Sequence, residues 1–466
     1  MVVYQVYPRS FQDSDGDGIG DLAGIRSRLD HLAWLGVDAL WMSPIYPSPL
    51  ADFGYDVCDY TDVDPVFGDL AEFERLVEAA HERGLKVLMD LVPCHTSIEH
   101  PWFREHPDWY IWADRPNNWI AAFGGSAWEK LGDRYYLHSF YPEQPDLDWR
   151  NPEVVAAMQD VIPFWLERGA DGYRIDAIDR LLKDAELRDD PPASEPYGLP
   201  LSEEEAKLAL SNSRNAPGTG EALAKIRDAA GDAFLVGEVY LPSVRWQPYI
   251  EHFDYAFAFE LLLARWEAPV LRAAIAACAK TGKAAWAMSN HDFGRLATRF
   301  GRENARAAAM LLLTLPGPAF LYQGDELAQG DGPPGESKHD RAGRDRFRHP
   351  MQWDPSPTGG FTTGTPWLPA VDPVERNVED QREDPGSTLS FVRGLIALRR
   401  ELGDSFELID AADGVVAYRR GGYGVAVNTT PEPRPSPLLG NPRMETVQGA
   451  LQGGALAAHS GVIAEG

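Results

Sequence analysis

Cysteine and long apolar runs are both scarce in this sequence. Its 466 residues include only three cysteines. Cys58, Cys94 and Cys278 are odd in number and fit no metal-ligand spacing, which argues against a disulfide framework or a cysteine-bound metal. No apolar stretch approaches membrane-spanning length, and the chain begins with a strand-like segment instead of a signal peptide. We therefore expect a soluble cytoplasmic protein with no membrane partner.

Basic residues are outnumbered by acidic ones. The 43 Lys and Arg residues stand against 71 Asp and Glu residues, which gives a net charge of −28. A surface of this charge repels phosphate groups and argues against a nucleic-acid partner. The acidic excess also suits a salt-rich habitat, and it does not choose among neutral ligands. The length allows two or three domains around a large core.

Strand and helix signals alternate through most of the chain. Short apolar runs are typical of buried strands, and apolar residues at helical spacing followed by glycine are typical of helices. The predicted helices include 22–35, 70–83 and 152–167. The predicted strands are 2–7, 39–42, 85–92, 172–176, 234–239, 254–259, 284–288 and 318–322. Eight strand–helix units predict a parallel (β/α)8 TIM barrel with right-handed crossovers.

The spacing between strand ends predicts an insertion after strand three. A barrel gives each unit about 30 residues. The 86 residues from Asp90 to Asp176 exceed one unit, so we expect a small inserted domain between them. The predicted barrel comprises residues 1–96 and 149–404. The inserted domain is predicted at 97–148, and a C-terminal β domain at 405–466. Further long loops at the barrel mouth are predicted at 189–215 and 325–384.

Two charged residues stand at the end of the fourth predicted strand. Arg174 and Asp176 are two positions apart, so both side chains point to the same face. The guanidinium should lower the pKa of Asp176 and keep it ionised, as a nucleophilic carboxylate requires. A plain strand-end salt bridge would give the same pattern, and this stretch alone does not decide between the two.

Three acids fall at the C-terminal ends of separate predicted strands: Asp176, Glu238 and Asp292. A barrel brings such residues together at one mouth. Hydrolysis of a glycosidic bond with retention needs one nucleophilic carboxylate and one carboxyl that donates and then accepts a proton. Glu238 ends an apolar strand, and burial there would raise its pKa, as a general acid requires.

With these three acids, the sequence resembles the α-amylase family of glycoside hydrolases over nearly its whole length. Four signature regions of that family are present: Asp90-Leu-Val-Pro-Cys-His95, Gly172-Tyr-Arg-Ile-Asp176, Gly237-Glu238 and Asn290-His-Asp292. Gln144-Pro-Asp-Leu-Asp-Trp149 resembles the QPDLN signature of the oligo-1,6-glucosidase and α-glucosidase branch. The segments 4–11 and 350–353 also resemble that branch.

The resemblance implies a role for each matching residue. Asp176 would be the nucleophile, Glu238 the acid/base, and Asp292 a transition-state binder of sugar hydroxyls. Arg174 would orient Asp176, and the substrate-binding residues would be Tyr55, Asp56, His95, His291 and Arg348. Within this set, Asp56 would pair with Arg348 and close the non-reducing end of the pocket.

An acidic loop follows the first predicted strand. Its alternating carboxylates suit a hard cation such as Ca²⁺. The glutamate that closes an EF-hand would fall at Gly24, so the loop is not an EF-hand, and its acids would repel phosphate. The resemblance implies structural Ca²⁺, or Mg²⁺, bound by Asp13, Asp15, Asp17, the Ile19 carbonyl and Asp21. A solvated acidic turn is the alternative, and no organic cofactor is expected.

Two positions depart from the family pattern. Cys94 stands where the family usually has asparagine, which changes local hydrogen bonding but removes no catalytic group. Ala177 follows the nucleophile where oligo-1,6-glucosidases carry valine and α-1,4-acting relatives carry threonine or alanine. A small side chain would widen the next subsite, which favours maltose-like α-1,4 substrates or sucrose over isomaltose.

Three functional hypotheses follow for a small oligosaccharide substrate. The first is a retaining, exo-acting α-glucosidase. The second is a glucosyl transferase or isomerase, such as a trehalose synthase or sucrose isomerase, which shares the three acids. The third is an inactive carbohydrate-binding or transporter-associated relative, which is disfavoured because such relatives usually lack these acids and carry a membrane anchor.

Overall fold

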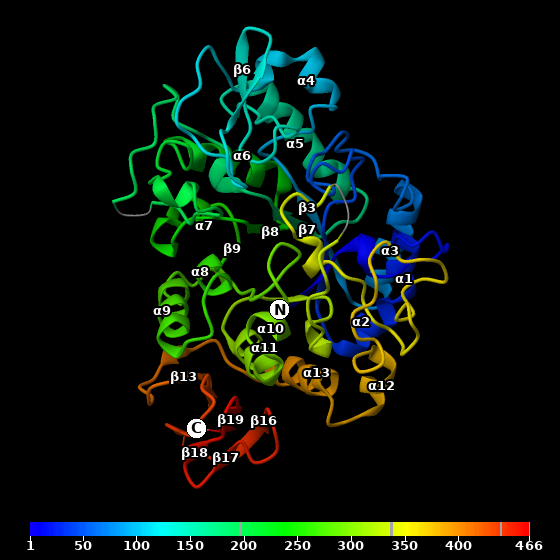
Figure 1. Cartoon of the computed structure of the whole chain (residues 1–466), viewed down its shortest axis with the longest axis vertical. Helices are drawn as coiled ribbons and strands as arrows, with labels where there is room; N and C mark the ends of the chain where they lie inside the picture. The colour runs from blue at the N-terminus through cyan, green and yellow to red at the C-terminus, as the bar shows by residue number, and fades with distance from the viewer. Residues whose placement is uncertain (195–196, 336–338, 439, 466) are drawn as a thin grey trace.

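The computed structural model describes residues 1–194, 197–335, 339–438 and 440–465. Its centre is an eight-stranded parallel sheet (Figure 1). In sheet order the strands are β10 (Ala284–Ala285), β9 (Tyr255–Phe257), β8 (Phe234–Gly237), β7 (Gly172–Ile175), β3 (Lys86–Leu91), β2 (Ala39–Met42), β1 (Val2–Val6) and β11 (Ala319–Tyr322).

The sheet curls until its two edge strands meet. A parallel bridge joins Trp286, just after β10, to Ala319 on β11, with hydrogen bonds from the Trp286 amide to the Pro318 carbonyl and from the Phe320 amide to the Trp286 carbonyl. The chain thus forms a nearly closed barrel, as the sequence predicts.

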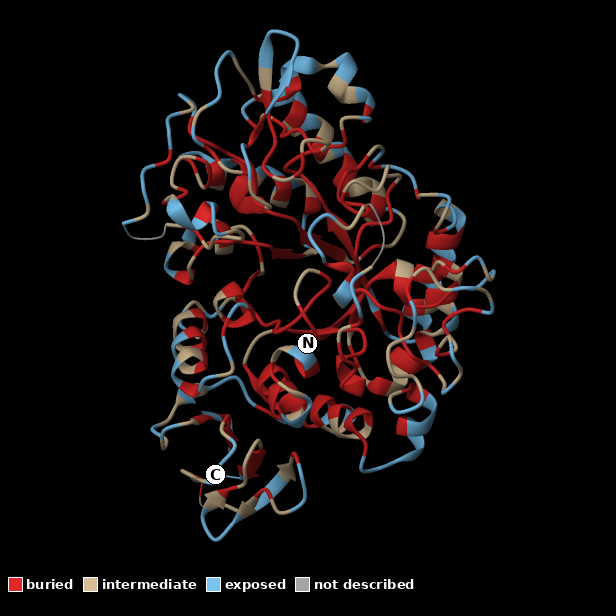
Figure 2. Cartoon of the chain, in the orientation of Figure 1, coloured by how far each residue is buried: buried red, intermediate tan, exposed pale blue. Residues whose placement is uncertain are grey.

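Alternate strand residues fill two separate cores. On β1, Val2, Tyr4 and Val6 pack in the large outer cluster under the helices, whereas Val3 packs in the inner cluster with Trp41 and other barrel-lining residues. This division follows from the two-residue period of a strand. Figure 2 shows buried residues concentrated along the strands and exposed residues on the outer turns.

The helices lie outside the barrel or between its connections. Their bounds are α1 (Leu22–Ser27), α2 (Leu29–Leu35), α3 (Leu70–Glu82), α4 (Pro101–Glu105), α5 (Pro152–Leu166), α6 (Thr219–Ala230), α7 (Gln247–Ile250), α8 (Phe259–Leu262), α9 (Ala268–Ala279), α10 (Leu296–Arg299), α11 (Ala305–Thr314), α12 (Val378–Glu383) and α13 (Thr388–Arg399). No helix in the described ranges has both the length and the apolar character required to cross a bilayer.

The inserted region after β3 forms a small antiparallel sheet. Its strands, in the order β4-β6-β5, are β4 (Trp112–Ala113), β6 (Arg134–Leu137) and β5 (Trp128–Leu131). They cover a separate apolar cluster that includes Ile111 and Trp119. This region and the C-terminal strands lie at opposite ends of the molecule (Figure 1).

The C-terminal part forms two antiparallel sheets. The first has the order β12 (Phe406–Leu408), β13 (Val415–Arg420), β14 (Tyr423–Asn428), β19 (Gly461–Glu465) and β16 (Pro442–Glu445). The second joins β15 (Arg434–Pro435), β18 (Ala455–Leu456) and β17 (Leu451–Gln452). The fold class is therefore confirmed, while the proposed domain boundaries stay predictions.

Several element bounds differ from the sequence prediction. The helix predicted at 22–35 is two helices, because Arg28 leaves helical geometry at φ −106° and ψ 5°. The strand predicted at 284–288 is short because Trp286 makes only an isolated bridge to the next strand. The segment predicted as strand 254–259 turns into helix α8 at Phe259.

Close strand pairing explains one of the signature glycines. A β-carbon on Gly172 would lie 2.1 Å from the Phe234 carbonyl oxygen of β8. Glycine therefore lets β7 approach β8 closely, and this approach brings the residues that follow the two strands, Asp176 and Glu238, to the same mouth.

Candidate active site

The three predicted acids open into one cavity at the barrel mouth. Asp176 follows β7, Glu238 follows β8, and Asp292 follows the short β10. The cavity holds about 190 Å³. It is lined by Asp52, Tyr55, His95, Phe123, Phe140, Asp176, Leu201, Glu238, Tyr240, Asp292, Phe293, Ala342 and Arg344.

One guanidinium lies between two of the acids. Arg174 Nη1 is 2.6 Å from Asp176 Oδ1, and Arg174 Nη2 is 2.5 Å from Glu238 Oε1. Nη1 also donates to Asp90 Oδ1 at 2.9 Å, because Asp90 of β3 is in register with Arg174 of β7. A single buried cation therefore serves three buried carboxyl groups.

Burial controls the protonation of this group. Loss of solvation raises the pKa of Glu238 to about 8, although the positive charge of Arg174 acts to lower it. Burial likewise raises the pKa of Asp176 to about 6, although Arg174 opposes the change and Glu238 shares its proton by a hydrogen bond. The predicted lowering of the Asp176 pKa is wrong because burial outweighs the guanidinium, but the carboxylate is still mostly ionised at neutral pH.

Asp292 has the opposite environment. Its Oδ1 accepts from Arg344 Nη1 at 2.8 Å and from Arg348 Nη2 at 3.0 Å, and its Oδ2 lies 3.3 Å from His291 Nε2. Burial alone would raise the pKa of Asp292, but His291 and the two guanidinium groups hold it well below its usual range. This carboxylate stays ionised.

Tyr55 and the two predicted histidines support one side of the cavity. The Tyr55 ring stacks on His291 at 5.3 Å with an interplanar angle of 5°, and its hydroxyl donates to Asp90. Burial lowers the pKa of His291 to about 3, so its ring is neutral. Burial also lowers the pKa of His95, whose Nε2 lies 3.0 Å from the Tyr55 carbonyl oxygen.

The predicted pairing of Asp56 with Arg348 is wrong. The Asp56 carboxylate is fully buried and accepts hydrogen bonds from Ser48 and from the amides of Ala51 and Asp52, so it organises its own loop. Asp52 reaches the cavity instead, and its carboxylate forms an ion pair with Arg344. Arg348 donates to Asp292 and to the His291 carbonyl.

Ala177 lies behind the cavity. It is fully buried and adopts left-handed geometry, with φ 43° and ψ 40°. Its amide donates to Glu238 Oε2 at 3.1 Å. The structure thus shows a backbone contact with the second acid. Ala177 is absent from the residues that line the cavity, so the prediction that its small side chain widens the next subsite finds no support.

Several cavity residues carry no motif that sequence reasoning used. These are Asp52, Phe123, Phe140, Leu201, Tyr240, Phe293, Ala342 and Arg344. Asp52 and Arg344 each stand four residues before a residue that was predicted, so the loops were correct and the residues within them were not. Phe123 and Phe140 belong to the inserted region, and Leu201 to a predicted mouth loop.

The acidic loop after β1 has a donor set that fits a hard cation. Single carboxylate oxygens of Asp13, Asp15 and Asp21 lie within 4.8 Å of one another. Burial raises the pKa of Asp13, but hydrogen bonds from Thr362 and from backbone amides outweigh it and lower that pKa. Asp17 accepts from the Ile19 amide and does not join this group of three.

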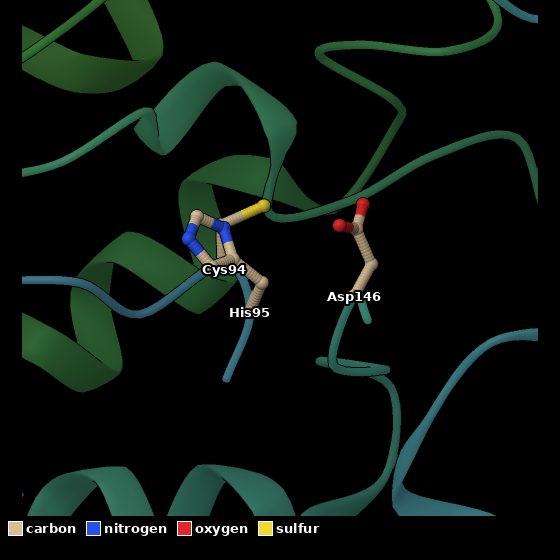
Figure 3. A group of neighbouring side chains, drawn as sticks. All are labelled: Cys94, His95 and Asp146. Carbon is tan, nitrogen blue, oxygen red and sulfur yellow. The ribbon is translucent and has the colours of Figure 1, made fainter. Parts of the chain in front are cut away.

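A second cluster of metal-type ligands is filled by a lysine. Cys94, His95 and Asp146 converge in Figure 3, with Asp146 on a separate segment from the other two. However, Lys183 Nζ is 2.5 Å from Asp146 Oδ2 and 3.7 Å from Cys94 Sγ. The ammonium already supplies the positive charge, so this buried cluster is a salt bridge, and its member His95 lines the cavity.

Known proteins are similar to this chain in sequence and architecture. Residues 5–405 match the family described as "Alpha amylase, catalytic domain". A probable α-glucosidase of Rhizobium meliloti is 42% identical over 86% of this chain and 82% of its own.

Two solved structures cover all of this chain. An α-glucosyl transfer enzyme has a TM-score of 0.91 with 37% identity over 98% of its own chain, and a trehalulose synthase variant has 0.90 with 31% identity over 99% of its own. Both the family match and the identity to a named relative support the resemblance seen in the motifs. The chain therefore belongs to the α-amylase family and is a glycoside hydrolase of its α-glucosidase branch.

Proposed function

We propose that the chain is a retaining, exo-acting α-glucosidase that cleaves terminal α-glucosidic bonds of short oligosaccharides, with maltose-like α-1,4 bonds favoured. The observation that carries the proposal is the single guanidinium of Arg174 shared by Asp176 and Glu238. The two carboxyl groups are also hydrogen-bonded to each other. Inverting enzymes need a wider gap, about 6.5–9.5 Å, to hold a water between their acids. This geometry therefore favours retention.

The first half-reaction uses the two acids in opposite protonation states. Ionised Asp176 attacks the anomeric carbon and forms an ester bond while the bond from that carbon to the glycosidic oxygen breaks. Glu238 gives its proton to that oxygen, and the leaving sugar departs as an alcohol. The order of the two pKa values, Asp176 below Glu238, supports this assignment.

The second half-reaction reverses the proton transfer. A water attacks the anomeric carbon, Glu238 takes one of its protons, and the ester bond to Asp176 breaks. The products are free glucose with its original anomeric configuration and the two carboxyl groups in their starting states.

Asp292 would bind sugar hydroxyls next to the reacting carbon. Its charge is maintained by Arg344, Arg348 and His291, so it can accept hydrogen bonds that strengthen as the ring approaches the oxocarbenium-like transition state. The neutral His95 and Tyr55 also line the cavity and would contact the same sugar.

The exo mode rests on the Arg344 guanidinium. It joins Asp52 to Asp292 and so ties the loop after β2 to the end of the cavity. This ion-paired wall would stop a longer chain from passing beyond the terminal sugar. It replaces the predicted Asp56–Arg348 pair as the basis for exo action.

Glucosyl transfer or isomerisation is the second candidate. The aromatic side chains Phe123, Phe140 and Phe293 line the cavity and would disfavour water relative to a sugar acceptor. The structural similarity to an α-glucosyl transfer enzyme and a trehalulose synthase is consistent with this reading. A hydrolase that prefers sucrose or isomaltose is a further alternative.

A structural cation would be held by the acidic loop. Asp13, Asp15 and Asp21 would supply its carboxylate oxygens, with Asp17 and the Ile19 carbonyl completing the predicted set. When bound, Ca²⁺ or Mg²⁺ would neutralise and crosslink the loop. The cytoplasmic location and the lack of a nucleic-acid partner stay predictions from composition.

The proposal is tested with p-nitrophenyl α-glucoside and with maltose, isomaltose and sucrose. Release of glucose from maltose at least as fast as from isomaltose is expected, with chromatography separating glucose from transfer products. A folded protein that releases no glucose from any of these substrates would overturn the proposal. Transfer products in excess of free glucose would favour the second candidate.

A further inference from the structure

Tyr240 touches the second acid and has no role in the mechanism above. It stands two residues beyond Glu238, lines the cavity, and is 4% exposed. Its hydroxyl donates to Glu238 Oε1 at 3.1 Å, the same oxygen that contacts Arg174. The Ala177 amide donates to the other oxygen.

The rest of Tyr240 is held firmly. Its ring packs on Phe259 with centroids 4.2 Å apart. Its amide donates to Asp179 Oδ1 at 3.1 Å, and its carbonyl accepts from the Leu199 amide at 2.8 Å. A hydroxyl fixed from the ring and from both backbone groups stays directed at Glu238.

The direction of this hydrogen bond has a chemical consequence. A donor to a carboxylate stabilises its ionised form. Glu238 must be protonated when the leaving group departs and ionised when water attacks, so its pKa has to suit both steps. Burial favours the protonated form of Glu238, and the hydrogen-bond donors on its two oxygens favour the ionised form.

We propose that Tyr240 is a positioning residue that stabilises the ionised form of Glu238 and so supports the second half-reaction. This inference rests on the proposed function. Without the Tyr240 hydroxyl, Glu238 would keep its proton to higher pH and would act more weakly as a base.

The test is Tyr240→Phe, which keeps the ring and removes the hydroxyl. The alkaline limb of kcat/KM for maltose should move up by about one pH unit, because a hydrogen bond to a charged group is worth about that much. At about pH 6 kcat should fall, and added azide should restore turnover because azide attacks without a base. For p-nitrophenyl α-glucoside, whose leaving group needs little protonation, kcat/KM should change little.

Tyr173→Phe is the matched control. Tyr173 is equally buried and lies one residue from Arg174, but its hydroxyl donates to the Ile162 carbonyl outside the barrel. This variant should lose stability by a similar amount with an unchanged pH profile. An unshifted alkaline limb in Tyr240→Phe, or an equal shift in both variants, would overturn the inference alone. A wild type with no turnover would overturn the proposed function and this inference together.

Discussion

The two halves of the cavity treat buried carboxylates in opposite ways. On one side, Asp90, Asp176 and Glu238 share the single guanidinium of Arg174, and burial raises the pKa of all three. On the other side, the two guanidinium groups of Arg344 and Arg348 serve Asp52 and Asp292. The neutral His291 ring lies beside Asp292, and the pKa of Asp292 falls. The ratio of cations to carboxylates therefore decides which acids hold a proton. One side can exchange protons with substrate, and the other side supplies a fixed charge.

The largest expected effect comes from removing the nucleophilic carboxylate, on the side with the raised pKa values. Asp176→Asn should lower kcat by about 10⁴-fold or more while the fold is retained, because the covalent intermediate can no longer form. The matched control is Asp254→Asn: Asp254 lies at the opposite end of the barrel strands, where it accepts hydrogen bonds from Arg227 and the Leu235 amide. Initial rates and circular dichroism check both variants. Full activity in Asp176→Asn would contradict the assignment of the nucleophile.

The next effect comes from taking a cation from the fixed-charge side. Arg344→Met should reduce kcat/KM by about 100-fold, because Asp52 and Asp292 both lose a buried ionic partner. Arg341→Met is the control, since its partner Glu143 is partly exposed, and it should cost about fivefold or less. Equal losses in the two variants would mean that the buried position of Arg344 has no special importance.

The pH profile sharpens the comparison further. Activity needs Asp176 ionised, which is favoured above about pH 6, and Glu238 protonated, which is favoured below about pH 8. The kcat/KM for maltose should therefore follow a bell whose limbs lie near these values, and Asp292 should add no limb between them. Steady-state rates from pH 4 to 10 measure it. A profile flat across this range would contradict the unequal protonation of the two acids.

The smallest effect on catalysis should come from the acidic loop, where carboxylates converge and form no ion pair with an arginine in the part of the chain that the structure describes. Added Ca²⁺ should raise the Tm by a few degrees and a chelator should lower it, because a ligand that binds only the folded state stabilises it. The kcat at 25 °C should stay within about twofold. Differential scanning fluorimetry and rates on the same samples check this. A Tm that changes neither with Ca²⁺ nor with the chelator would indicate a solvated acidic turn.

The barrel was predictable because its strands are short, largely apolar runs that alternate with helical segments. Sequence reasoning placed Asp176, Glu238 and Asp292 together because strand ends meet at one mouth. The resemblance implied Asp56, whereas Asp52 lines the cavity; both stand in an irregular loop that turns at Gly54, with φ 107°. No periodicity encodes that choice.

The direction of the pKa shift of Asp176 could not be predicted from the sequence either. Arg174 and Asp176 are adjacent on one strand face, so the pair was visible. The competing Asp90 is on a different strand and meets Arg174 only through the register of β3 and β7. Burial and the count of competing carboxylates come from this packing, and they reverse the direction of the pKa shift.

The most direct test of double displacement by Asp176 and Glu238 is the anomeric form of the first product. Proton NMR would follow fresh wild-type enzyme acting on p-nitrophenyl α-glucoside before mutarotation. The two carboxyl groups bridged by Arg174 predict α-glucose as the first signal, with β-glucose growing in later. β-Glucose as the first product would contradict a retaining mechanism and the roles assigned to both acids.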